Sequence, residues 1–304
     1  MSSPPPSRIR LTEVGPRDGL QNEPDKVPTE AKVAFVNALA RTGVDEVEVS
    51  SFVSPKWVPQ LADAEEVFRR IERRPGVIYS ALVPNEKGLE RALSVAPDKV
   101  NVFTAASETF SRKNTNVSLA ESLDRLRVVV RRAHEEGLPV RGYVSTAFHC
   151  PYEGFIPPER VLPVIEALWE MGVGEISLAD TTGRATPPRV RALLERVLAR
   201  VPAERVNLHL HDTYGMAIAN ALTAWEEYGI RSFDGAAGGL GGCPFAPGAA
   251  GNVATEDLAY AFQACGAEVR VEPSRITAAL QAVLPHLHRA PTSRLSRLSG
   301  SAPA

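Results

Sequence analysis

Short apolar runs and longer amphipathic stretches alternate along nearly the whole chain. The short runs are rich in Val and Ile and have the length of buried strands. In the stretches between them, apolar residues recur at helical spacing, most clearly over 29–41, 119–136 and 188–200. Strands that alternate with helices predict a parallel sheet, and eight such units favour a closed (β/α)8 TIM barrel, an α/β fold. The predicted strands are 9–15, 46–51, 77–83, 99–105, 139–147, 175–181, 205–213 and 232–237.

The two ends of the chain differ from this pattern. Beyond the last predicted strand, the stretches 252–266 and 275–287 predict additional C-terminal helices. The segments 1–7 and 289–304 are rich in Ser and Pro, and we expect both to be flexible. We therefore expect a single catalytic barrel domain over residues 8–288.

Composition and charge narrow the classes of function. Of the 304 residues, 44% are hydrophobic and 23% are charged, as in ordinary globular proteins. The formal net charge of −2 lacks the basic excess of a nucleic-acid-binding protein, so we expect no nucleic-acid partner. No apolar run reaches the ~18 residues that span a bilayer, so we expect no membrane partner. Three scattered cysteines, Cys150, Cys243 and Cys265, form no disulfide framework, which favours the reducing cytoplasm.

Arg17 and Asp18 lie directly after the first predicted strand. The carboxyl ends of the strands carry the active site in a barrel of this kind, and Gly15 and Gly19 allow the chain to bend there. The pair would bring a cation and a hard oxygen ligand to the mouth of the barrel. An ion pair on the surface is the alternative interpretation.

His209 and His211 end the seventh predicted strand. Residues two apart in a strand point to the same face, so both imidazoles can converge on one metal ion. His286 and His288 have the same spacing, but they lie in a late helical or tail segment, where side chains two apart diverge. We therefore interpret the second pair as structural or solvated.

A glycine-rich segment, 238–251, follows the eighth predicted strand. Its glycines predict a loop that can move and approach a ligand closely. Cys243 in this loop is either a reactive thiol or a small buried apolar residue, and Asn252 offers a neutral oxygen ligand. Two oxygens and two imidazoles without a thiolate suit Mg²⁺ or Mn²⁺, and they also allow Zn²⁺ or Co²⁺. The predicted metal ligands are Asp18, His209, His211 and Asn252.

Four motifs give the chain a family resemblance over about residues 8–287. The chain resembles hydroxymethylglutaryl-CoA lyases in VGPRDGLQNE (14–23), SFVSPKWVPQ (51–60), HLHDTYGMA (209–217) and GLGGCPFAPGAAGNVATED (239–257). Related metal-dependent barrel enzymes, including isopropylmalate and homocitrate synthases, share the first motif and the His-x-His-Asp. The cysteine loop and the 51–60 segment are much more specific to the lyases.

The resemblance implies a divalent-metal-dependent retro-Claisen cleavage of (S)-3-hydroxy-3-methylglutaryl-CoA to acetyl-CoA and acetoacetate, as in leucine catabolism and ketone-body formation. It implies that Arg17 stabilises the enolate of acetyl-CoA and that Cys243 donates a proton to it. A base is also needed, and either Asp180 or His209 would serve. The family further implies a homodimer. The acidic residues that the resemblance links to activity or to order in the site are Glu48, Asp180 and Glu256.

No sharp motif identifies the contacts with the acyl-CoA substrate. Gln21 lies in the same motif as Arg17, and we expect both to contact the substrate. A charged segment after the fourth strand, similar to one in the family, would meet the CoA phosphates or form a solvated cluster. His149 departs from the glycine of well-known members, and it would line the pocket or tune the choice of substrate. The charged segment is Arg112, Lys113 and Asn114.

Four other functions compete with this one. A lyase for a larger 3-hydroxy-3-alkylglutaryl-CoA would differ only in the shape of its pocket. A Claisen-condensing acyltransferase typically has a Gly-x-Gly-Glu-Arg loop where this chain has Gly-Gly-Cys-Pro. A biotin-dependent carboxyltransferase carries a carboxylated lysine, for which strands five and six show no clear counterpart. A metal-binding protein without catalysis would lack Arg17 or Cys243, and both are present.

Overall fold

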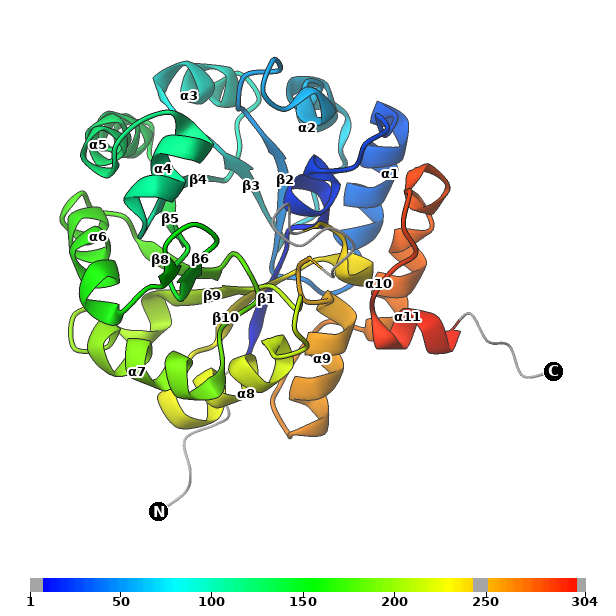
Figure 1. Ribbon diagram of the computed structural model, residues 1–304. Coiled ribbons are helices and arrows are strands. Elements are labelled where there is room, and N and C mark those ends of the chain that lie inside the picture. The colour runs from blue at the N-terminus through cyan, green and yellow to red at the C-terminus, as the bar shows by residue number, and fades with distance from the viewer. Residues whose placement is uncertain (1–7, 243–250, 300–304) are drawn as a thin grey trace.

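The computed structural model describes residues 8–242 and 251–299. Within them, eight parallel strands close into a barrel in the order β1-β10-β9-β8-β5-β4-β3-β2 (Figure 1). Each strand lies inside one of the eight predicted ranges, so the predicted (β/α)8 fold is confirmed. The strands are β1 (Arg10–Glu13), β2 (Glu46–Ser51), β3 (Ile78–Leu82), β4 (Lys99–Ala105), β5 (Val140–Ser145), β8 (Glu175–Asp180), β9 (Val206–Leu210) and β10 (Ser232–Gly235).

Helices surround the barrel and cover its outer face (Figure 1). The longest of them, α5, begins at a capping box, in which Ser118 and Glu121 each accept a hydrogen bond from the other's backbone N–H. Helices α9 and α10 follow the last strand, where additional helices are predicted. The helices are α1 (Thr29–Leu39), α2 (Ala64–Arg70), α3 (Glu86–Leu93), α4 (Glu108–Thr115), α5 (Leu119–Glu135), α6 (Pro158–Glu170), α7 (Pro187–Val197), α8 (Ala217–Tyr228), α9 (Thr255–Ala264), α10 (Pro273–Leu280) and α11 (Arg294–Ser299).

A small antiparallel hairpin, β6 (His149–Cys150) and β7 (Gly154–Phe155), lies between β5 and α6. The sequence pattern does not predict it, because two-residue strands show no periodicity. Among the helices of the described residues, none has both the length and the apolar character needed to cross a bilayer.

Residues 289–299, which belong to the segment expected to be a flexible tail, contain regular structure. Helix α11 lies within it, and Ser293 just before this helix is buried. The Ser293 hydroxyl donates to Asp257 at 2.9 Å, and the Ser296 hydroxyl donates to Glu256 at 2.6 Å. The Ser-rich composition suggested solvation, but these hydroxyls instead pair with carboxylates at the start of α9.

Charged side chains fill part of the barrel interior. The buried guanidinium of Arg141 donates to Glu175 at 2.8 Å, to Asp234 at 3.0 Å and to Glu46 at 3.3 Å. Lys99 donates to Glu46 at 2.9 Å and to Glu175 at 2.6 Å. Each buried charge is thus paired and hydrogen-bonded, as burial requires. This interior charged layer consists of Glu46, Lys99, Arg141, Glu175 and Asp234.

Candidate active site

A tight turn after β1 places the first pair of candidate residues. The segment Gly15–Gly19 is a single π-helical turn, in which the backbone N–H groups of Arg17, Asp18 and Gly19 donate to the Val14 carbonyl at 3.2, 2.7 and 3.1 Å. Such turns are rare in proteins, and those that occur often lie at functional sites. The turn brings both Arg17 and Asp18 to the carboxyl end of the barrel.

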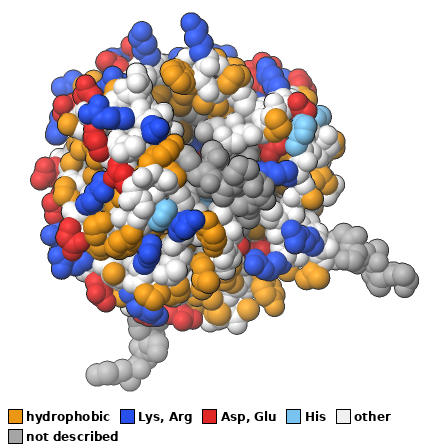
Figure 2. All heavy atoms as spheres, in the orientation of Figure 1, with side chains coloured by type: hydrophobic (Ala, Val, Ile, Leu, Met, Phe, Trp, Pro, Cys, Tyr) orange, Lys and Arg blue, Asp and Glu red, His pale blue; other side chains and the backbone are white. Residues whose placement is uncertain are grey.

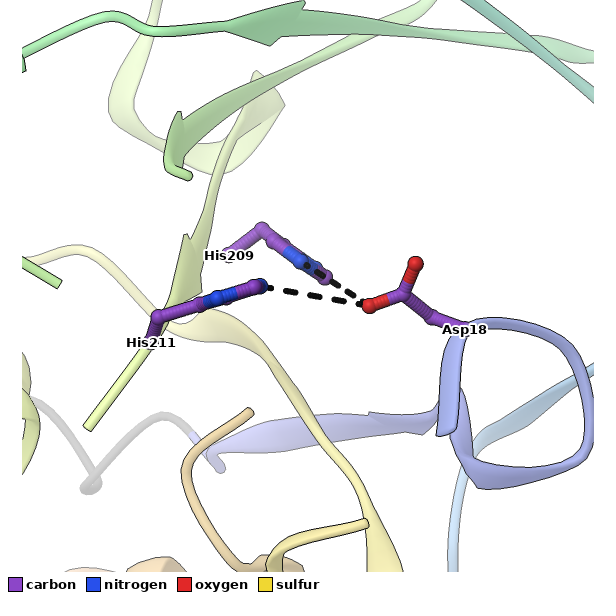
Figure 3. Close-up of side chains that lie close together, drawn as sticks. All are labelled: Asp18, His209 and His211. Carbon is purple, nitrogen blue, oxygen red and sulfur yellow. Dashed lines mark ion pairs between the residues drawn. The ribbon is translucent and has the colours of Figure 1, made fainter. Parts of the chain in front are cut away.

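Asp18 faces two imidazoles from the end of β9 (Figure 3). Its Oδ2 lies 3.8 Å from Nε2 of His209 and 3.9 Å from Nε2 of His211. One ligand atom from each of the three residues lies within 4.8 Å of the others. The strand spacing therefore does bring both imidazoles to one point, as the sequence predicts.

Asn252 completes the predicted set. It forms a β-bridge with His211, and its Nδ2 lies 2.8 Å from Oδ2 of Asp18. The backbone of Gly241 passes close beside the Asn252 amide and has a φ of +100°. A side chain at this position would place its Cβ only 2.7 Å from Nδ2 of Asn252. Only glycine suits that position. All four predicted metal ligands thus meet at the mouth of the barrel.

The electrostatics of these groups suit a bound divalent cation. Burial favours the neutral form of Asp18, but Arg17 and the two imidazoles outweigh it and hold the pKa of this carboxyl well below its usual value. Burial, together with His209, lowers the pKa of His211 to about 4, so this imidazole is neutral at pH 7. Among the described residues, its buried Nδ1 has no hydrogen-bond partner. The ionised Asp18 and the neutral His211 are in the protonation states that metal ligation requires. Burial lowers the pKa of His209, but Asp234 and Asp18 outweigh it and raise that pKa, so a cation competes with a proton at this imidazole.

Arg17 is held by a buried carboxylate. Its Nε donates to Glu48, and its Nη1 donates to Asp18 at 2.5 Å. Glu48 also accepts from the Tyr143 hydroxyl at 2.8 Å and from Asn101 at 2.7 Å. Since Glu48 does not line the cavity of the site, its contacts make it a residue that orients Arg17.

Two further predicted acids hold backbone segments. Asp180 is buried and accepts from the amides of Arg184 at 3.0 Å and Ala185 at 2.9 Å, and burial raises its pKa to about 7. Burial also raises the pKa of Glu256, which accepts from the Gly238 amide at 3.0 Å. Neither carboxylate lines the cavity, although the His209 imidazole opposes the effect of burial on the pKa of Asp180.

A cavity of about 940 Å³ opens beside the predicted ligands and is lined by Arg17, Asp18, His209 and His211. Gln21, Lys113 and Asn114 also line it, as predicted for substrate contacts. Four residues that are not among the predicted site residues line it as well: Lys26, Trp57, Arg125 and Tyr143. Figure 2 shows Lys and Arg side chains spread over this face of the barrel.

Two predicted residues, Arg112 and His149, stand apart from the cavity. Arg112 extends from α4 into solvent, where its Nε lies 2.7 Å from Oε1 of Glu108. His149 does not line the cavity either, and its Nδ1 lies 3.4 Å from Oγ1 of Thr182. Cys243 lies outside the described residues.

Glu13, at the end of β1, links the loops that carry the predicted ligands. Its Oε1 accepts from the amides of Gly15 at 2.8 Å and Ala237 at 2.9 Å, and its Oε2 accepts from the Thr255 hydroxyl at 2.6 Å. Burial raises the pKa of Glu13 to about 8, although these hydrogen bonds oppose the shift.

Glu13→Gln should make the stability of the protein less dependent on pH. Because burial raises the folded pKa above the unfolded value of ~4.3, the folded state holds this proton more tightly. The free energy of unfolding should therefore fall between ~pH 4.3 and about 8, with at most ~1.4 kcal/mol per pH unit from Glu13. Denaturation curves across this range measure the slope. Asp180 and Glu256 contribute to the pH dependence of the wild type and of the variant alike. Equal slopes in the two proteins would therefore contradict a protonated Glu13.

The chain matches the HMGL-like family over residues 8–283. It belongs to this family. A hydroxymethylglutaryl-CoA lyase of Bacillus subtilis, YngG, is 49% identical over 276 residues, which cover 91% of this chain and 92% of that relative. The crystal structure of a Bacillus subtilis HMG-CoA lyase has a TM-score of 0.95 at 46% identity, covering 98% of this chain and 100% of that chain. An HMG-CoA lyase from Acinetobacter baumannii, in complex with coenzyme A and 3-methylmalate, has a TM-score of 0.90 at 38% identity, covering 98% of each chain.

These similarities confirm the resemblance drawn from the four motifs and make this HMGL-like protein a carbon–carbon lyase. Two buried side chains of the site escaped the sequence analysis, Tyr143 and Asp234. Each is a polar residue within a predicted apolar strand, and that exception to the pattern is the signal that would have found them.

Proposed function

We propose that this HMGL-like protein cleaves (S)-3-hydroxy-3-methylglutaryl-CoA to acetyl-CoA and acetoacetate with the help of Mg²⁺ or Mn²⁺. The observation that carries the proposal is the meeting of Arg17 with Asp18, His209 and His211 at one cavity. The similarity to hydroxymethylglutaryl-CoA lyases along nearly the whole chain supplies the substrate.

The reaction breaks the C2–C3 bond of the substrate. The C3 hydroxyl loses its proton, a carbonyl forms at C3, and the electron pair of the broken bond becomes the enolate of acetyl-CoA, which then takes up a proton at C2. A divalent cation at the four predicted ligands would lower the pKa of the C3 hydroxyl and fix its orientation.

The contacts of Arg17 support its proposed role in stabilising the enolate oxygen. Glu48 engages its Nε and Asp18 its Nη1, and within the described residues its Nη2 has no hydrogen-bond partner. The guanidinium lines the cavity and is buried apart from that surface. A donor held in place before the charge develops needs no reorganisation during the reaction, which is the basis of oxyanion stabilisation.

Proton transfer requires a base and an acid. Of the two predicted bases, His209 lines the cavity and Asp180 does not. The hydrogen bonds of Asp180 to the Arg184 and Ala185 amides support a role in ordering the loop after β8. We propose Cys243 as the acid that protonates C2. We propose His209 as the base only while its Nε2 is not bound to the cation, because that atom holds the single ring lone pair of the neutral imidazole.

Purified protein should release acetoacetate from (S)-3-hydroxy-3-methylglutaryl-CoA with Mg²⁺ or Mn²⁺, and EDTA should abolish the release. Added back in excess over the chelator, the cation should restore it. A coupled assay for acetoacetate measures the rate. Undiminished activity after exhaustive chelation would refute the metal dependence, whereas a cation-bound protein that is inactive would refute the substrate.

Two details of the proposal have their own tests. Assays with a longer 3-hydroxy-3-alkylglutaryl-CoA, and with acetyl-CoA and acetoacetate in the condensing direction, compare the rival reactions through kcat/KM.

We also propose a cytoplasmic homodimer, supported by the three scattered cysteines and by the family resemblance. Sedimentation equilibrium of the full chain measures the assembly.

A further inference from the structure

Asp234, on β10, contacts one of the predicted metal ligands. Its Oδ2 lies 3.1 Å from Nδ1 of His209, and the two residues are register partners across the parallel β10–β9 pair. Its Oδ1 accepts a hydrogen bond from Nη1 of Arg141 at 3.0 Å. Asp234 is buried and lies outside the cavity lining, and the chemistry proposed above makes no use of it.

We infer that Asp234 is a positioning residue that holds the proton of His209 on Nδ1 and so keeps Nε2 available to a divalent cation. An ionised carboxylate only accepts hydrogen bonds, so the hydrogen between the two groups belongs to Nδ1. In a neutral imidazole, the lone pair is then on Nε2, and this atom faces Asp18 at 3.8 Å. The inference rests on the proposed metal-dependent function.

Arg141 directs the carboxylate of Asp234 toward His209. Its guanidinium is held by Glu175 and Glu46 in the interior charged layer, so its Nη1 has a set direction. Because Oδ1 of Asp234 is held by this group, Oδ2 is turned toward the imidazole. Tyr143 packs edge-on against the same imidazole, with ring centroids 5.7 Å apart and planes at 84°. The orientation of His209 is therefore set before any cation arrives.

The second imidazole provides a contrast within the same site. Nδ1 of His211 is buried and has no hydrogen-bond partner among the described residues. One imidazole of the pair thus has a carboxylate that sets its tautomer, and the other does not. Of the two imidazoles, removing the charge of Asp234 should consequently affect His209 and not His211.

The test is the affinity of the full-length protein for Mn²⁺, measured by the electron paramagnetic resonance signal of free Mn²⁺. Asp234→Asn should weaken binding ~10–100-fold, as is typical for outer partners of metal ligands. The metal concentration needed for half-maximal activity should rise by a similar factor, with a smaller change in kcat at saturation. Wild-type affinity in a folded Asp234→Asn variant would overturn the inference.

Ser232→Ala is the matched control, because Ser232 lies on the same strand and donates to Glu175 at 3.0 Å without touching His209. It should bind Mn²⁺ as the wild type does, and an equal loss would mean that the charged layer acts only through general stability. If the wild-type protein itself bound no Mn²⁺, the proposed metal dependence would fail first, which separates the two failures.

A measurement on the wild-type protein applies even if Asp234→Asn does not fold. Long-range ¹⁵N–¹H correlation spectra of the metal-free protein at alkaline pH report the tautomer of each histidine. The spectrum of His209, assigned with His209→Gln, should show hydrogen on Nδ1. Hydrogen on Nε2 would overturn the inference.

Discussion

Arg17→Gln should lower kcat for cleavage of (S)-3-hydroxy-3-methylglutaryl-CoA by ~10²–10³-fold or more. Losses of this size follow the removal of one donor that stabilises a developing oxyanion. Gln can still donate a hydrogen bond, but it brings no charge to the cavity and none to Asp18, whose pKa Arg17 lowers. Initial rates at saturating substrate and Mn²⁺ measure the effect, and a Mn²⁺ titration separates slower chemistry from weaker metal binding.

Arg112→Gln is the control for this variant. It removes an arginine from the exposed side of α4, where it pairs with Glu108 outside the cavity. Both kcat and KM should stay at their wild-type values. A normal kcat in Arg17→Gln, or equal losses in the two variants, would argue against a specific role for Arg17.

His211→Ala should weaken Mn²⁺ binding more than ~100-fold, because loss of a ligand costs more than loss of an outer partner, for which ~10–100-fold is typical. Acetoacetate release at micromolar Mn²⁺ should fall with it. The variant removes a neutral, buried imidazole whose Nε2 faces Asp18. Isothermal titration calorimetry measures the affinity, and circular dichroism verifies the fold.

The chain carries its own control in the second His-x-His pair. His288 lies far along the chain from β9, and its exposed imidazole contacts Asp25 at 2.5 Å. His288→Ala should keep both the Mn²⁺ affinity and the activity. If His288→Ala lost as much Mn²⁺ affinity as His211→Ala, the assignment of the metal site to the His209–His211 pair would be contradicted.

The barrel fold and the convergence of the predicted metal ligands could be predicted from the sequence, because each depends on patterns within single segments of the chain. The alternation of strands and helices follows directly from the apolar pattern, and His209 and His211 share a face because they are two residues apart in one strand. Asp18 follows from the rule that the carboxyl ends of barrel strands meet at one mouth.

The contacts between strands could not be read in this way. Asp234 meets His209 because the two are register partners in the β10–β9 pair. Tyr143 on β5 and Glu48 on β2 lie on strands that are not adjacent, and they meet inside the closed barrel. That register depends on the closure of all the strands together. Tyr143 and Asp234 stand out as polar residues within apolar strands, but no local pattern predicts which groups they meet.

Two predicted site residues, Asp180 and Arg112, do not line the cavity, although their neighbours in the sequence do. Asp180 lies between Ala179 and Thr181, which line the cavity, so the two-residue period of a strand turns its side chain the other way. Arg112 and Lys113 are successive residues of α4 and point about 100° apart, so only Lys113 reaches the cavity. In both cases the same periodicities that predicted the fold would have separated the residues.

The order in which the chain is synthesised has a consequence for the cation site. Asp18 leaves the ribosome early, whereas His209, His211 and Asn252 leave late, and the seam between β1 and β10 joins the two ends of the barrel. A nascent chain that stops before Asn252 cannot assemble the four predicted ligands, however well its first helices and strands have folded. Capture of a cation at the proposed site would therefore be a property of the finished barrel, for which truncated translation products could not compete.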